Sequence, residues 1–131
     1  MSSLKPITPA GITAALQKAE RYRLLNDAVA AESICLDVLD IDADNQEALV
    51  SLVLSITDQL DHELTEGVAR ARKVLPRVTD EYERTYLAGI ICERRGKAQL
   101  HRGALGSAEV AADWGAFFRE SNWPCTAARR P

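Results

Sequence analysis

The sequence predicts an all-α protein built from antiparallel helical hairpins, with about six helices in a single domain over residues 1–131. Hydrophobic residues make up 47% of the chain and charged residues 27%, proportions that are typical of a globular domain. Only seven glycines and five prolines interrupt the 131 residues. Apolar residues recur at spacings of three and four, which is the pattern of helices that bury one face.

The first hairpin is expected over residues 9–41. Thr8 followed by Pro9 is typical of a helix N-cap with proline in the first turn. A polar turn at Asn26 and Asp27 is expected to separate its two helices. The second of these helices should carry most of its apolar side chains on one broad face: Val29, Ile34, Cys35, Val38, Leu39 and Ile41.

The second hairpin is expected over residues 45–78. Asp44 is placed to cap its first helix, and Glu47, three residues later, would complete a capping box. Its two helices are expected to end near Leu60 and just before Pro76, because proline cannot continue a helix.

The third hairpin is expected over residues 80–121, and a tail over residues 122–131. The sequence leaves open whether its long first helix ends at Gly96 or runs to about His101. That helix is expected to carry a wide apolar face: Tyr82, Tyr86, Leu87, Ile90 and Ile91.

A spacing of 34 residues relates the first two hairpins. Apolar or small positions of the first helix return one repeat later, where Leu16, Ala19 and Tyr22 are followed by Val50, Val53 and Ile56. Ala31 is also small, as required where two helices touch. The pattern resembles the tetratricopeptide repeat, whose period is about 34 residues. The resemblance is best over residues 12–49 and degenerate afterwards.

This resemblance implies a short right-handed solenoid of stacked hairpins, in which the first helix of each pair lines a concave groove. Family members that grip a C-terminal carboxylate use lysine and asparagine at positions that Leu16 and Glu20 occupy here, so we do not expect that clamp. We expect instead a non-enzymatic protein–protein interaction scaffold that binds an apolar or amphipathic peptide or helix. The family's groove positions correspond to Leu16, Glu20, Arg23, Val50, Leu54 and Asp58.

A basic segment over residues 94–102 offers an alternative, the binding of an acidic partner or RNA. Its cations are Arg94, Arg95, Lys97 and Arg102. The formal net charge of the whole chain is −3, and no aromatic residue lies between these cations. A nucleic-acid partner is therefore the less favoured alternative.

An aromatic stripe at spacings of three and four, formed by Trp114, Phe117 and Phe118, marks the last expected helix. It would pack on the preceding helix or, as an uncovered end of a repeat stack, pair with a second copy in a homodimer.

Asp40, Asp42 and Asp44 have the spacing of the first ligands of a calcium loop. The loop also requires glycine at position 6 and a bidentate glutamate at position 12, and these positions hold Asn45 and Ser51. We therefore expect a turn between helices and no metal.

No catalytic or cofactor motif is present, although an enzyme of an unrecognised type stays open as a further alternative. Cys92 and His101 would lie about 13 Å apart along one helix, too far for a nucleophile and its base. The three cysteines are widely spaced, which favours reduced thiols. No stretch approaches the roughly 20 apolar residues of a membrane span, and the start MSSLKPITP lacks a signal-peptide pattern. We expect a cytoplasmic protein without a membrane partner.

Overall fold

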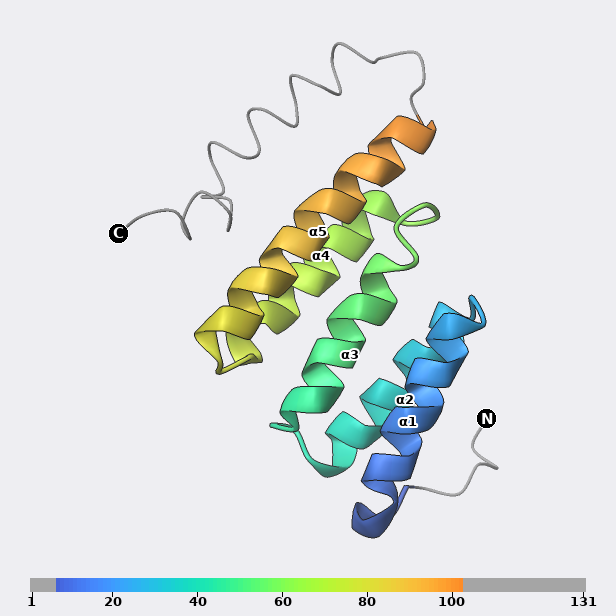
Figure 1. Cartoon of the computed structure of the whole chain (residues 1–131), viewed down its shortest axis with the longest axis vertical. Coiled ribbons are helices and arrows are strands. Elements are labelled where there is room, and N and C mark those ends of the chain that lie inside the picture. Colours follow the sequence, from blue (N-terminus) through green and yellow to red (C-terminus); the bar gives the residue numbers. More distant parts are fainter. Residues whose placement is uncertain (1–6, 103–131) are drawn as a thin grey trace.

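The computed structural model describes residues 7–102, which contain five α-helices and no strand. The all-α class is therefore confirmed (Figure 1). A short 3-10 turn, Pro9–Gly11, leads into α1, and a second one, Leu75–Arg77, follows α4. The sixth helix and the tail expected from the sequence lie outside the described residues. The helices are α1 (Ile12–Leu24), α2 (Ala28–Ile41), α3 (Gln46–Thr57), α4 (Leu64–Val74) and α5 (Glu81–Arg102).

The helices form two layers, with α1, α3 and α5 side by side in the near layer of Figure 1 and with α2 and α4 behind them. Consecutive helices pack on each other, and α3 also contacts both α1 and α5. The chain runs in the same direction through α1, α3 and α5. These three helices therefore share one face of the molecule.

Side chains cap α2, α3 and α5 at their first turns, and at the start of α5 it is Asp80 that accepts a hydrogen bond, from the backbone N–H of Tyr82 at 3.3 Å. Asp27 accepts a hydrogen bond from the backbone N–H of Ala30 at 3.1 Å, and Asn45 accepts one from Ala48 at 2.9 Å. The expected cap by Asp44 is wrong, because the helix begins one residue later than that cap requires. Asn45 takes the extended backbone conformation of an N-cap residue.

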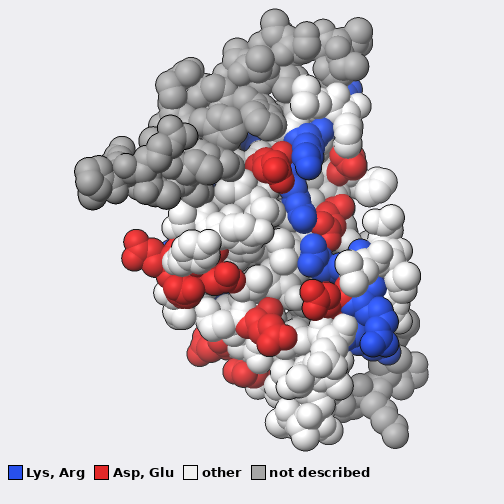
Figure 2. Space-filling view, viewed as in Figure 1, with Lys and Arg blue, Asp and Glu red and all other residues white. Residues whose placement is uncertain are grey.

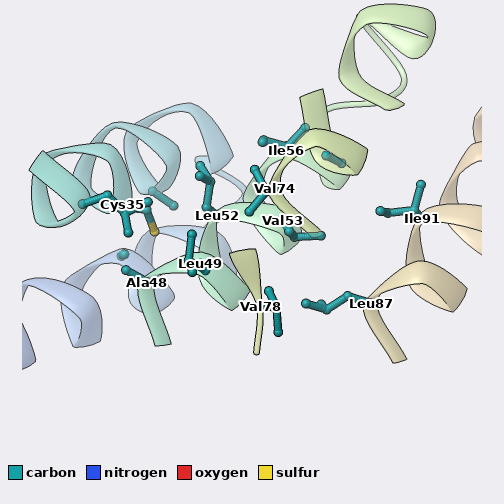
Figure 3. Packing of buried hydrophobic residues seen from close by; sticks show 14 of the residues in the cluster. Cys35, Ala48, Leu49, Leu52, Val53, Ile56, Val74, Val78, Leu87 and Ile91 are labelled. Carbon is teal, nitrogen blue, oxygen red and sulfur yellow. The ribbon is translucent and has the colours of Figure 1, made fainter. Parts of the chain in front are cut away.

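The core is centred on α3, whose buried residues face α2 on one side and α5 on the other. Figure 3 shows Leu49 beside Cys35 of α2, and Val53 on the side of Leu87 and Ile91. All five of these side chains are almost completely buried. Because α3 packs on α2 with one side and on α5 with the other, the described helices share one continuous core.

The apolar face of α2 is narrower than the sequence predicts. Val29 is 68% exposed and Ile41 is 38% exposed, whereas Cys35 and Val38 are fully buried. At about 100° per residue, Val29 and Ile41 each lie roughly 120° from Cys35 around the helix. They are apolar, but they fall outside the side of α2 that meets α1 and α3.

The long helix α5 does not break at Gly96, which is buried inside it. It continues to Arg102, so the question that the sequence left open is answered in favour of the longer helix. Its wide apolar face divides in two: Leu87 and Ile91 are buried, whereas Tyr82 is 76% exposed and Tyr86 is 52% exposed.

Ala19 has no exposed surface, at the position where α1 meets its neighbours. Ala19→Leu is expected to lower the free energy of unfolding by about 2 kcal/mol, since extra carbon atoms in a filled core force helices apart. Urea unfolding followed by circular dichroism would measure this change. Ala14→Leu, at an exposed position of the same helix, is the matched control and should change stability little. Equal stability of the two variants would contradict close packing at Ala19.

Candidate binding surface

Three charged residues link α1, α3 and α5 on their shared side. Asp58, which follows α3, accepts a hydrogen bond from Arg23 Nε of α1 at 2.8 Å through Oδ2. Its Oδ1 forms an ion pair with Arg94 of α5. The side chains of Arg23, Asp58 and Arg94 are only 19%, 24% and 26% exposed, so screening by water is reduced. One carboxylate therefore joins three helices that are distant in sequence.

Arg94 also binds the carboxyl end of α3. Its guanidinium donates to the hydroxyl of Thr57 at 2.9 Å and to the carbonyl oxygen of Leu54 at 3.2 Å. The Leu54 carbonyl oxygen also accepts from the backbone N–H of Asp58 at 3.0 Å, and carbonyl groups in the last turn of a helix carry partial negative charge. The guanidinium therefore stabilises the end of α3 as well as the Asp58 carboxylate.

We call the surface presented by α1, α3 and α5 the three-helix face, and it contains Arg23, Val50, Leu54, Asp58 and Arg94. Figure 2 shows this face of the molecule. Acidic side chains gather at the lower left, over the beginnings of α3 and α5, and basic side chains form a band from the top to the lower right. The charges on this face are therefore unevenly distributed, with an acidic region at one end.

A cleft of about 340 Å³ opens at the acidic end of the three-helix face, between the beginnings of α3 and α5. Its apolar lining residues are Val50, which is half-buried, and Val78, which is only 1% exposed. Its remaining lining is polar or acidic: Gln46, Glu47, Thr79, Asp80 and Glu83. A cleft of this composition offers both an apolar contact and negative charge.

Hydrogen bonds between two turns join the two sides of this cleft. Gln46 Nε2 donates to the carbonyl oxygens of Asp44 at 2.9 Å and Arg77 at 3.3 Å, while its Oε1 accepts from the N–H of Thr79 at 2.9 Å. The guanidinium of Arg77 donates in turn to the carbonyl oxygen of Ala43 at 2.8 Å. The turn before α3 and the segment before α5 are therefore fixed relative to each other.

The structure places the residues expected in a groove in three different environments. Leu16 is only 4% exposed and belongs to the core, so it is not available to a partner; it lies on the same side of α1 as Ala19. Val50 and Leu54 are half-buried and reach the surface, and Glu20 is exposed. Arg23 and Asp58 come together, but as an ion pair with each other.

The basic segment of α5 is largely balanced by nearby carboxylates. Arg94 forms an ion pair with Asp58, and Lys97 Nζ lies 4.0 Å from Glu93 Oε1. His101 Nδ1 lies 3.2 Å from Asp61 Oδ1 at an exposed position. Arg102 is exposed, and Arg95 makes interactions of its own. The expected four-residue patch Arg94, Arg95, Lys97 and Arg102 is thus not a continuous field of unpaired positive charge.

A second hollow, of about 480 Å³, lies on the outer side of α1. Lys18 and Arg21 line it together with Tyr22 and Leu25, and the Lys18 ammonium stands 5.9 Å from the centre of the Tyr22 ring. This hollow is basic where the cleft between α3 and α5 is acidic.

The candidate catalytic and metal-binding residues do not come together in one site. Cys92 is buried in α5, and His101 is exposed at the end of the same helix. Asp40 and Asp42 are exposed around the end of α2, where Asp42 Oδ2 accepts a hydrogen bond from the amide of Asn45 at 3.3 Å. Over residues 7–102 there is no group of three or more histidine, cysteine, aspartate or glutamate side chains placed to hold a metal ion.

None of the helices between residues 7 and 102 is both long and apolar enough to cross a membrane. Trp114, Phe117 and Phe118, expected as a face for pairing with a second copy, lie outside the described residues.

Comparisons of the chain with protein-family models, with curated proteins and with solved structures find no match. The function is therefore inferred from the surfaces of the molecule itself.

Proposed function

We propose that this chain is a non-enzymatic, tetratricopeptide-like binding module that holds an amphipathic segment of another protein on the three-helix face. The observation that carries the proposal is that α1, α3 and α5 lie side by side, run in the same direction and share one surface (Figure 1). The first helices of stacked hairpins present a surface of this kind to their ligands.

The spacing of the contacts between hairpins supports a repeat of about 34 residues. The bond between Arg23 and Asp58 spans 35 positions, that between Arg77 and Ala43 spans 34, and that between Gln46 and Thr79 spans 33. Equivalent turns and helix ends therefore meet one repeat apart, as in stacked hairpins.

The chemistry of the three-helix face favours an amphipathic ligand. Val50 and Leu54 lie half-buried along α3, with the acidic cleft at one end and the ion pairs of Asp58 at the other. An apolar strip with charged ends suits a helix that has an apolar face and polar flanks, the helix-in-groove mode of recognition.

Leu54→Asp tests the proposed function. We expect this variant to keep the helical circular dichroism of the parent, because Leu54 already reaches water, and to lose the partners that the parent retains in affinity capture. An unpaired carboxylate facing an apolar ligand surface costs binding free energy. Leu36→Asp is the matched control: Leu36 is 46% exposed on α2, in the other layer, and its substitution should leave capture unchanged. Normal capture by a folded Leu54→Asp variant would refute the proposal.

A further inference from the structure

We propose that the cleft between the beginnings of α3 and α5 receives a lysine or arginine side chain of the bound protein segment. This inference rests on the proposed function and specifies the partner: an amphipathic segment with a basic residue beside its apolar face. It follows from the lining, the charges and the rigidity of the cleft.

The lining suits a long cationic side chain. Lysine and arginine place an apolar stem along apolar surface while the charged end stays near water or a counter-ion. The half-buried side chain of Val50 provides the apolar contact, whereas Val78 is only 1% exposed and belongs to the core. Glu47, Asp80 and Glu83 also line the cleft. The volume of about 340 Å³ is at the lower end of the range for small-molecule sites, roughly 300 Å³.

The three carboxylates are not neutralised by cations of the described chain. Over residues 7–102, Glu47, Asp80 and Glu83 take part in no ion pair. Asp80 accepts one hydrogen bond, from the backbone N–H of Tyr82 at 3.3 Å. Elsewhere on the three-helix face, by contrast, Asp58 binds two guanidinium groups. The cleft therefore keeps its negative charge for a ligand.

Two other ligand classes fit less well. An anion would be attracted to the beginnings of α3 and α5 by the helix dipoles, but it would meet three carboxylates there. A metal ion would need oxygen ligands that converge, and these carboxylates do not form a group that could hold one. A cationic group on an apolar stem satisfies both the charge and the apolar lining.

The cleft is also prepared for binding, because the hydrogen bonds of Gln46 join its two sides before a partner arrives. Groups that are already held in place lose less conformational entropy on binding. Val50 lines the cleft and lies one helical turn from Leu54. The basic residue would therefore enter the cleft while the apolar face of the same segment lies along α3.

The experiment uses two fluorescein-labelled peptides: an amphipathic helix of leucine, alanine and lysine, and its twin with every lysine replaced by glutamine. Fluorescence anisotropy at 50 mM salt should give at least tenfold tighter binding of the lysine peptide to the full chain. The double variant Glu47→Gln/Glu83→Gln should remove at least four fifths of that preference. Val50→Lys, which puts an ammonium of the chain itself into the cleft, should abolish it.

The control variant Asp37→Asn/Glu66→Gln makes the same change in net charge on the other layer, at exposed positions of α2 and α4. Glu66 also matches Glu83, because both acids lie in the first turn of a helix. The preference for lysine should survive in this control. An equal loss of the preference for lysine in both double variants would show that net charge attracts the peptide non-specifically. That result would refute the cleft as the site for a basic side chain.

The remaining outcomes separate the two proposals. If Leu54→Asp weakens binding of both peptides while Glu47→Gln/Glu83→Gln and Val50→Lys keep the preference for lysine, the three-helix face holds and the cleft is refuted. If Leu54→Asp also leaves binding unchanged, both are refuted. Equal affinity of the parent for the two peptides, or no binding of either, refutes the cleft as a site for a basic side chain.

Discussion

Asp58→Ala is expected to lower the free energy of unfolding by about 3 kcal/mol, because it leaves two poorly hydrated guanidinium groups without their shared carboxylate. Arg23 and Arg94 each lose their ion pair across helices. The loss should appear as a lower midpoint in urea unfolding with an unchanged slope.

Asp61→Ala is the control for this prediction. Asp61 pairs with His101, and both side chains are more than half exposed, so the variant should lose at most about 1 kcal/mol. A second comparison is the double variant Asp58→Ala/Arg94→Leu, which should be more stable than additivity of the two single changes predicts, since residues in one network couple. Equal stability of Asp58→Ala and Asp61→Ala would show that the three-helix ion pairs contribute little.

The second large effect concerns alkaline pH and Cys35. Burial raises the pKa of the Cys35 thiol from 9.0 to about 11. Below pH 9 the thiol is protonated in both the folded and unfolded states, and stability does not depend on it. Between pH 9 and 11 only the unfolded state loses the proton, so stability falls as the pH rises, by about 3 kcal/mol in total.

Urea unfolding at pH 8 and pH 10.5, with Cys35→Ala beside the parent, would measure this term. Other groups titrate in the same range, and the difference in slope between the two proteins isolates Cys35. Iodoacetamide at pH 8 should also leave Cys35 unmodified in the folded protein and alkylate it in urea, because the thiolate is the reactive form. A parent and a Cys35→Ala variant that lose stability in parallel would contradict the raised pKa.

Residues whose role depends on local sequence were predicted well. The helical period, the turn at Asn26 and Asp27 and the end of α2 at Ile41 all follow from nearby residues. Asn26 even takes a left-handed conformation, with φ of 63°, which asparagine tolerates better than most residues. The same periodicity places Val50 and Leu54 at the surface, which both residues reach, whereas their part in a groove stays a prediction.

Residues whose role depends on distant neighbours were not predicted well from the sequence. The sequence placed Arg23 and Asp58 on one surface but contained no signal that they pair, because the distance between α1 and α3 is set by the whole core. Leu16 was expected in the groove but is buried in the core of the folded chain. No local signal in the sequence marks Gly67, although a Cβ atom there would come within 2.5 Å of Leu60 Cδ2. The cleft depends on Gln46, whose partners lie 31 and 33 positions further along the chain.

The short reach of these contacts bears on how quickly the chain folds. The side-chain hydrogen bonds and ion pairs between helices described above join residues at most 40 positions apart, as in the bond between Arg94 and Leu54. Chains dominated by contacts of short sequence separation close small loops and fold rapidly, in microseconds to milliseconds for helical domains. During synthesis at roughly 5–20 residues per second, α1, α2 and α3 would pack together before α5 has left the ribosome. Within residues 7–102, the acidic cleft, which needs Asp80 and Glu83, and the ion pair between Asp58 and Arg94 would therefore both form after α1, α2 and α3 have packed.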